Sequence, residues 1–531
     1  MWHNHAESFD CCFGRCGHQS KKTLDYKNQF LESFIFDKFH YYLAVSRDFI
    51  RKVAFGLGLE EELPNDPLLW SQKQFDKIPN LIWGHPLPSL EDQRKRYGQW
   101  VYGDRKVLRN KFKNDRLKYE NEKDQLRKTT GEKFFETFEL SVRHTSALAT
   151  DSPAFERMWQ FWGNFFAISE KDFLASFSTG VYQREIIRPN MNKTFEDLVY
   201  NVTTSWCMLH HLDNAENIGP SSKRGISINS DPQEKSKVGL NENHARELLE
   251  LHTVSPGANY TQEDVIEMAK VMTGWKYLWN KKYLEAGPIK FQDEYHENGP
   301  YKILGKIYDI RDYNTVSQGK ELKVVIKDLA NHPSTKKHIA LKLCQHFICD
   351  EPNEEMMNKI IKAWDQSDGS LIDIHKATMK VAFEYGNNFK KFSMPELWLL
   401  QNSKMLDLKY YLYSYPKGFE FSGSVPRTKQ LLVKRILEQL GHPIYRAKQP
   451  NGYVDLEDEW LSPELIIRRL AVARRFPEMS NSKLIYDNDF FENVIISNFD
   501  EPSNLLNLMK TPTTYSDKFV IFANSPEVMR S

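Results

Sequence analysis

Apolar positions recur along most of the chain at intervals of three and four residues, the spacing of one face of an α-helix. In residues 260–275, the apolar side chains of one such face are Val265, Met268, Met272 and Trp275. Thr261, followed three residues later by Asp264, resembles a capping box and predicts where this helix begins. The same spacing predicts helices over residues 332–348 and 353–366.

Polar and glycine-rich stretches separate these predicted helices. Residues 219–239 form a Ser/Gly/Pro-rich loop, and residues 287–310 predict a loop or a small hairpin with His296 at its centre. No internal repeat and no low-complexity segment is visible. We therefore predict an all-α fold, a large single helical domain with at most a small β-hairpin near residues 287–310.

Residues 91–133 are a run of charged residues of both signs. Apolar side chains recur within the run at multiples of three and four residues, namely Val101, Leu108, Phe112, Tyr119 and Leu126. This spacing predicts one long solvated helix with a single buried stripe. The mixed signs argue against a surface for nucleic acid.

Composition places the chain among soluble globular proteins. Its 531 residues are 40% hydrophobic and 13% aromatic, enough for a sizeable core. Lys and Arg number 72 against 71 Asp and Glu, so the net charge of +1 gives no bulk attraction to nucleic acid or an anionic membrane. No apolar run approaches the roughly 20 residues that span a bilayer. The first 25 residues lack the apolar segment of a signal peptide.

The organisation along the chain predicts four regions. They are a Cys/His-containing mobile leader (1–25), N-terminal helices with the long charged helix (26–133), a core carrying the polar motifs (134–400), and a C-terminal helical region packed on that core (401–531).

The six cysteines divide between the leader and the body of the chain. Cys11, Cys12 and Cys16 lie among histidines and could hold zinc, but the second ligand pair of a structural zinc site is missing. A mobile tail is therefore the preferred interpretation of the leader. The remaining cysteines, Cys207, Cys344 and Cys349, are scattered and predict buried, reduced thiols.

Residues 241–252, NENHARELLELH, predict a helix that Asn241 or Asn243 can cap. Its buried face consists of Ala245, Leu248, Leu249 and His252, and its polar face carries Glu242, Asn243, Arg246, Glu247 and Glu250. One interpretation is a surface ladder of ion pairs. The other is the wall of a site, in which the carboxylates bind a cation or act as a base, the arginine holds an anionic group and the asparagines orient a substrate.

Four further places have two interpretations each. Asp213 and Asn214 follow an apolar helix and either end it in a turn or join a site. His296 beside Glu297 either shapes a turn or supplies an acid–base group or ligand. Arg188 before Pro189 suits a buried ion pair with Glu185 or Glu247, and His332 suits the start of a helix.

The chain contains no established catalytic signature. G-x-S-x-G, the P-loop, G-x-G-x-x-G and H-E-x-x-H are all missing, as is the Glu-x-x-His pattern of di-iron bundles in residues 241–252. Haem and nucleotide therefore find no support. The cofactor stays unknown, with a divalent metal as the candidate that carboxylates could hold.

A series of ordered motifs resembles the bacterial domain of unknown function 1800 (DUF 1800) family over roughly residues 40–530. The motifs are ALATDSPAFERMWQFWGNFFAIS (147–169), YQREIIRPN (182–190), MLHHLDNAENIGPSS (208–222), GLNENHARELLELHT (239–253), YTQEDVIEMAKVMTGW (260–275), HENGPYKILG (296–305), HPSTKKHIALKLCQHFICDEP (332–352) and NSPEVMR (524–530). FGLG at 55–58 is similar to the family's N-terminal RFGLG. The resemblance implies a mainly helical fold and no particular reaction.

The resemblance also implies properties of the members and exposes departures in this chain. Family members often look exported and are encoded beside sulfatase-like proteins, which makes such a protein a candidate partner. Where the family commonly has FWHNHF, this chain has Gly163 and Phe165 in place of two histidines, and Asn190 replaces a third. If those histidines are ligands or acid–base groups, this member is altered or inactive.

Two hypotheses follow. In the first, the protein is a hydrolase-like or metal-assisted enzyme with a pocket built around residues 241–252. The candidate catalytic residues are Glu247, Glu250, His296 and Asp213, and the candidate substrate-binding residues are Asn241, Asn243, Arg246, Arg188 and Asn214. In the second, it is a non-catalytic helical scaffold or partner protein whose polar motifs are structural networks.

Overall fold

The computed structural model describes residues 46–531 with short interruptions, namely 85, 130, 172, 235, 281–284, 310–318, 387, 410–431, 481–488 and 513. The leader 1–25, with Cys11, Cys12 and Cys16, lies outside the described residues. Cys207, Cys344 and Cys349 are buried free thiols, as predicted.

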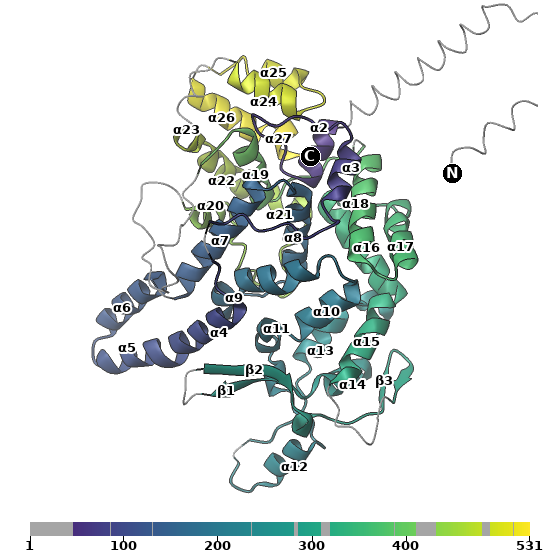
Figure 1. Cartoon of the computed structure of the whole chain (residues 1–531). Coiled ribbons are helices and arrows are strands. Elements are labelled where there is room, and N and C mark those ends of the chain that lie inside the picture. Colours follow the sequence, from purple (N-terminus) through teal and green to yellow (C-terminus); the bar gives the residue numbers. More distant parts are fainter. Residues whose placement is uncertain are drawn as a thin grey trace, which may run out of the picture.

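The fold is mainly helical, which confirms the predicted all-α class (Figure 1). The first helices are α2 (Ser46–Val53), α3 (Pro67–Lys73), α4 (Leu90–Gly98), α5 (Arg105–Lys111) and α6 (Arg116–Thr129). The middle of the chain forms α7 (Glu132–Ala149), α8 (Pro153–Phe165), α9 (Leu174–Tyr182), α10 (Phe195–Thr203), α11 (Trp206–His211), α12 (Lys223–Ser230), α13 (Asn243–Glu247) and α14 (Gln262–Met272).

Helices resume after two small sheets. They are α15 (Lys320–Asn331), α16 (Pro333–Phe347), α17 (Glu354–Ser367), α18 (Leu371–Tyr385) and α19 (Pro395–Met405). The C-terminal region contributes α20 (Val433–Gln439), α21 (Glu457–Trp460), α22 (Pro463–Ala473), α23 (Phe476–Met479), α24 (Phe490–Asn498), α25 (Ser503–Leu508), α26 (Tyr515–Asn524) and α27 (Pro526–Met529).

The sheets are two antiparallel pairs. β1 (Trp275–Asn280) pairs with β2 (Glu285–Phe291), and β3 (Tyr301–Ile303) pairs with β4 (Lys306–Tyr308). The second pair is the small hairpin expected within residues 287–310. In Figure 1 the strands and α12 lie at the lower end of the molecule, and the C-terminal helices lie at the upper end.

Two large apolar clusters form the core, and α7 contributes to both. Phe134 and Phe138 of α7 belong to the larger cluster, which extends from α2 to α18. Leu140 of the same helix belongs to the cluster built from α19 and the C-terminal helices. The long central helix therefore joins the two clusters.

The charged segment is not the single long helix that its apolar spacing predicts. A π-helical turn (Gln99–Asp104) links α4 to α5, and residues 112–115 separate α5 from α6. Asp115 interrupts the helix, because its carboxylate accepts the N–H of Lys118 at 3.0 Å and so caps the start of α6. The five side chains of the predicted stripe are half-buried rather than buried, and Val101 and Leu126 pack against the larger apolar cluster.

Capping residues in the sequence predicted the starts of other helices correctly. Thr261 and Asp264 form the predicted capping box of α14, and His332 accepts the N–H of Ser334 at the start of α16. Trp275 was wrongly assigned to the helical stripe. Gly274, with a φ of +85°, ends α14 and directs Trp275 into β1.

None of the described helices combines the length and the apolar character that crossing a membrane requires.

Candidate functional site

Residues 241–252 fold as α13 followed by a π-helical turn (Leu248–His252). The predicted buried face of this helix is confirmed, since Ala245, Leu248, Leu249 and His252 are all buried. The hydroxyl of Thr253 donates to the Leu248 carbonyl at 2.6 Å and the N–H of Ser255 donates to the Leu249 carbonyl at 2.9 Å. These two bonds close the wide final turn.

One of the predicted ion pairs forms on the exposed face of the helix. Arg246 pairs with Glu242 at 3.1 Å and also donates to the side chain of Gln262 on α14 at 2.8 Å. Both charged side chains are more than one-third exposed, so this ion pair contributes only a few tenths of a kcal/mol. Its main effect is to hold the guanidinium beside α14.

Glu247 and Glu250 lie beside this pair, next along the same helix. Glu247 is half-buried, and burial together with the charge of Glu250 raises its pKa. Glu250 accepts a hydrogen bond from the hydroxyl of Tyr260 at 3.1 Å. The pKa of Tyr260 is raised by burial and by the same glutamate. Two neighbouring carboxyl groups, one with a raised pKa, therefore share this part of the surface.

The asparagines in front of α13 hold the turn that leads into it. The Asn241 side chain accepts the N–H of Asn243, the first helical residue, at 3.0 Å. The N–H of Asn241 in turn donates to the Asn217 side chain at 3.0 Å. The predicted cap by Asn241 or Asn243 was wrong, because the N-cap position is Glu242, whose side chain makes no capping bond. Asn241 instead holds the turn before the helix, and the side chain of Asn243 is exposed.

Asp213 and Asn214 end α11 in a tight turn. Asp213 has a φ of +58° and forms an ion pair with Lys171. Asn214 is fully buried, and its amide donates to the carbonyls of Met272 at 3.1 Å and Trp275 at 3.0 Å. The Asn214 side chain thus holds the junction between α14 and β1.

His296 is buried against the same junction. Its Nδ1 lies 2.9 Å from the Thr273 carbonyl, and its Nε2 lies 2.9 Å from the hydroxyl of Tyr301. Burial lowers the pKa of this histidine. Glu297 accepts the N–H of Ser221 at 2.8 Å, which joins this loop to the segment before α12. Both ring nitrogens of His296 are thus occupied within the protein.

Arg188 does not contact the partners that the sequence suggested. Its guanidinium binds both carboxylate oxygens of Glu156 at 2.7 and 2.9 Å, and donates to the Pro79 carbonyl at 3.0 Å. The pairing with Glu185 or Glu247 was therefore wrong. Glu156, on α8, lies within the buried core, where a bidentate arginine satisfies a carboxylate best.

The histidines on the back of the helix were not selected from the sequence as site residues. His244 and His252 are 0% and 1% exposed, and neither ring nitrogen of either side chain has a hydrogen-bond partner within the described residues. Burial, together with the neighbouring His211 and His338, lowers the pKa of His252 to about 3. The pKa of His338 is lowered to about 4, mainly by burial. The sequence signal that could have identified His244 and His252 was their eight-residue spacing, which places both on the buried face of the predicted helix.

The three positions where this chain departs from the family pattern are filled by other contacts. A Cβ at Gly163 would lie 2.7 Å from the Gln183 side chain, so that side chain occupies the space of a larger residue. The ring of Phe165 lies 6.4 Å from that of His252. The side chain of Asn190 donates to the Ile186 carbonyl at 2.6 Å.

A buried polar chamber lies where the two core clusters meet. Its free volume is about 20 Å³, room for a single water molecule. Arg143 binds both carboxylate oxygens of Glu396 at 2.7 and 2.9 Å. Arg157 contacts Nε2 of His346 at 2.7 Å, and Nδ1 of that ring contacts Asp455 at 2.7 Å. No motif in the sequence predicted this chamber, which is too small for an organic substrate.

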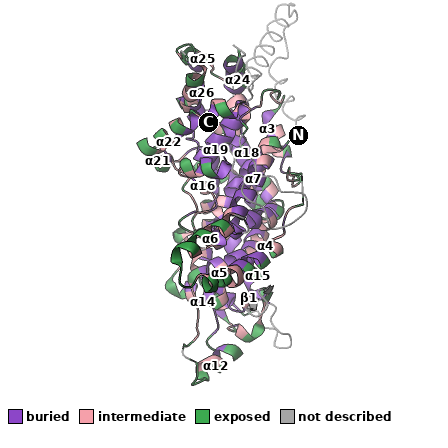
Figure 2. Cartoon of the chain, turned by 90° about the vertical axis from the view of Figure 1, so that its left-hand side faces the viewer, coloured by how far each residue is buried: buried purple, intermediate pink, exposed green. Residues whose placement is uncertain are grey.

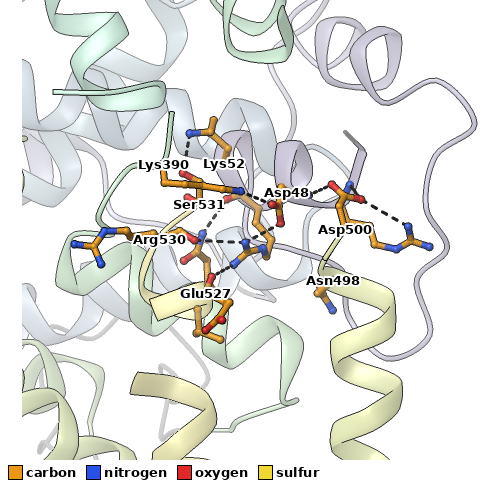
Figure 3. A network of polar contacts seen from close by, with 12 residues as sticks. Asp48, Lys52, Lys390, Asn498, Asp500, Glu527, Arg530 and Ser531 are labelled. Atoms are coloured by element: carbon orange, nitrogen blue, oxygen red, sulfur yellow. Dashed lines mark hydrogen bonds and ion pairs between the residues drawn. The ribbon is translucent and has the colours of Figure 1, made fainter. Parts of the chain in front are cut away.

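A larger cavity of about 410 Å³ lies beside the C-terminal segment. Figure 3 shows the network of polar contacts in this region. Its wall holds charged residues of both signs, namely Asp48, Arg51, Lys390, Asp500, Glu501, Glu527 and Arg530. Asp48 pairs with Arg51 and Lys390, and Arg530 pairs with Glu457. The volume suits a small molecule, but the three cations are already paired within the protein.

The same region joins the two ends of the family-like segment. Lys52 donates to the carbonyls of Ile348, Phe389 and Ser531, and burial lowers its pKa to about 7. The side chain of Asn498 exchanges hydrogen bonds with the backbone of Leu57. The guanidinium of Arg51 donates to the Glu527 carbonyl of NSPEVMR at 2.8 Å. The segment that includes FGLG and the C-terminal end of the chain, far apart in the sequence, therefore meet at one junction.

Within the described residues, no three His, Cys, Asp or Glu side chains are grouped as metal ligands. The structure thus brings Glu247, Glu250 and Arg246 together on one face, and gathers Asn214 and His296 at the junction of α14 and β1. Arg188 belongs to a separate ion pair in the core.

Comparison with known proteins gives one match. The model of a family described as protein of unknown function (DUF1800) matches residues 59–525. No curated protein matches the chain, and no solved structure matches it.

Proposed function

We propose that this chain, which belongs to the DUF1800 family, is a hydrolase-like enzyme whose acid–base pair is Glu247 and Glu250. One observation carries the proposal: Glu247 is half-buried beside a second carboxyl group, and its pKa is raised. A carboxyl group with a raised pKa keeps its proton to higher pH and can donate it to a leaving group. Its neighbour can then accept a proton from the attacking water.

The surrounding side chains have roles that suit this chemistry. Tyr260 orients the Glu250 carboxylate through its hydroxyl. Arg246, held in place by Glu242 and Gln262, can bind an anionic part of a substrate. The exposed side chain of Asn243 can add a polar contact at the start of the helix.

The other candidate residues act in this proposal as positioning residues. Asn241 holds the turn before α13, and Asn214 and His296 hold the junction behind α14. Asp213 pairs with Lys171 at the surface, and Arg188 stabilises the core through Glu156. A divalent cation, if one takes part, would bind the same two carboxylates, since oxygen ligands of this kind suit Mg²⁺.

The test measures hydrolysis of chromogenic esters, phosphoesters and glycosides by the purified protein, with and without Mg²⁺. Glu247→Gln and Glu250→Gln are expected to lower the rate on the accepted substrate by roughly 100-fold or more, the range for loss of an acid–base group. Glu263→Gln, at an exposed position of α14, is the matched control and should keep the wild-type rate. Equal rates in all four proteins, or no turnover of any substrate, would contradict the proposal.

A second candidate function is a non-catalytic scaffold, and a specific observation favours it. Asn214, Arg188 and His296 are all buried, and each has its polar atoms bound to other segments of the chain. Such networks fix loops to a core without chemistry. This candidate predicts that the protein co-purifies with a sulfatase-like protein encoded beside it, and that Glu247→Gln changes neither the complex nor any activity.

A further inference from the structure

Residues 106–118, named here the basic tip, comprise most of α5, the connection to α6 and the start of α6. Six cationic side chains lie within it, namely Lys106, Arg109, Lys111, Lys113, Arg116 and Lys118. Asp115 is its single acidic residue, so the tip has a net charge of +5 in a chain whose net charge is +1. The charge balance of the whole protein therefore hides a strongly cationic segment.

The cations of the tip are available to a partner. In the described part of the chain none of the six forms an ion pair, whereas Lys123 and Lys128, farther along α6, pair with Glu120 and Asp124. The carboxylate of Asp115 accepts a backbone N–H. The tip thus lacks the local compensation that the rest of α6 has.

Exposed apolar side chains lie among these cations. Leu117 is 76% exposed and Val107 is 64% exposed. The ring of Phe112 lies between them in the sequence, with Lys111 and Lys118 above it at 5.2 and 5.4 Å from the ring centre. Cations surrounding exposed apolar groups are the composition of helices that bind at a membrane surface.

The tip also projects from the body of the protein. In Figure 1, α5 and α6 form a helical hairpin that extends beyond the other elements, with the connection at its outer end. Figure 2 views the molecule from that side and shows both helices largely exposed. A flat surface can therefore approach the tip before it meets the body of the molecule.

We propose that the basic tip docks on the surface of an anionic phospholipid bilayer. The six cations lie at the headgroups, where each basic residue adds to the attraction, and Leu117 and Val107 enter the edge of the acyl region. The exposed apolar groups favour a bilayer over nucleic acid, whose phosphate backbone gives no comparable site for a leucine. Attachment of this kind requires no membrane-spanning helix.

Co-sedimentation of the full-length protein with lipid vesicles tests this proposal. Vesicles of phosphatidylcholine with roughly one-third phosphatidylglycerol should bind the protein, and vesicles of phosphatidylcholine alone should not. The triple change Lys106→Gln, Arg109→Gln and Lys113→Gln should lower the partition coefficient on the order of 100-fold, about fivefold for each cation. Leu117→Ser should lower it several-fold without any change in charge.

The matched control neutralises three exposed lysines on other helices, through Lys337→Gln, Lys362→Gln and Lys380→Gln, and should bind as the wild type does. Equal binding to both kinds of vesicle, or an equal loss in the control, would overturn the proposal. So would tighter binding to a DNA duplex or to a poly-glutamate peptide than to the anionic vesicles. An unchanged partition for Leu117→Ser would overturn the insertion of the apolar side chains.

Discussion

The carboxylate of Glu396 on α19 accepts two hydrogen bonds from the guanidinium of Arg143 on α7, at 2.7 and 2.9 Å. Both side chains are almost fully buried, at the place where the two apolar clusters meet. Burial alone would raise the pKa of Glu396, but Arg143 and the hydrogen bond with His144 outweigh burial and hold the pKa far below its usual value. The pair therefore joins the C-terminal region to the rest of the protein through charge.

Breaking this buried pair should be far more costly than breaking an exposed one. Glu396→Gln leaves Arg143 as an uncompensated buried charge, and we expect a loss of about 3–5 kcal/mol in the free energy of unfolding. The control is Glu464→Gln in the exposed pair with Arg468, where we expect less than about 0.5 kcal/mol. Urea unfolding measures both. Equal losses in the two variants would show that Glu396 and Arg143 do not join the two clusters.

The buried histidines make the protein sensitive to acid. The pKa is lowered to about 3 for His252 and His375 and to about 4 for His338 and His442, in each case mainly by burial. Unfolded histidine has a pKa near 6.5, so between about pH 6.5 and 4 the unfolded chain binds protons that the folded protein does not. Above pH 6.5 these histidines do not lower the free energy of unfolding. Below pH 6.5 the free energy of unfolding should fall by about 1.4 kcal/mol per pH unit for each of them.

His252 allows a specific check of this pH dependence. Its ring nitrogens have no hydrogen-bond partners within the described residues, and the ring of Phe166 lies 5.1 Å away. His252→Leu and His252→Asn both remove the titrating group, so both should reduce the slope of stability against pH by about one proton. At pH 8, His252→Asn should be less stable than His252→Leu, because it keeps an unpaired polar group in an apolar place. Unchanged slopes in both variants would contradict the assigned pKa.

Asn214 should be essential for the junction between α14 and β1. Asn214→Ala removes the donors to the Met272 and Trp275 carbonyls, and we expect a loss of about 1–3 kcal/mol. Asn214→Asp should cost more, since a carboxylate directed at two carbonyl oxygens replaces the donors with repulsion. Hydrogen exchange should show faster exchange near residues 272–280 in both variants. Wild-type exchange there would mean that Asn214 does not hold the junction.

Local signals in the sequence were sufficient for the fold class and for several helix ends. Thr261 with Asp264, His332 before Pro333, and the buried face of residues 241–252 were correct because each depends on side chains within a few residues of one another. The continuous helix over residues 91–133 was wrong because periodicity does not reveal a cap such as Asp115.

Partners that are distant in the sequence were beyond local reasoning. Arg188 binds Glu156 and Arg143 binds Glu396, and nothing in the spacing of these residues distinguishes them from other charged pairs. His244 and His252 were not predicted as site residues because they lie on the buried face of residues 241–252, whereas the candidate residues came from the polar face. The cations of residues 106–118 were hidden by the balanced charge of the longer run around them.

The most direct test of the central claim is the pKa of Glu247 itself. The ¹³C signal of its carboxyl carbon, assigned by comparison with Glu247→Gln, can be followed by NMR from acid to neutral pH in the wild type and in Glu250→Gln. The account predicts that Glu247 titrates above the ordinary glutamate range in the wild type, because burial and the charge of Glu250 both disfavour its ionised form. It also predicts that the pKa falls toward the ordinary value in Glu250→Gln. A pKa at or below the ordinary value in the wild type, or one that Glu250→Gln leaves unchanged, would contradict the acid–base pair.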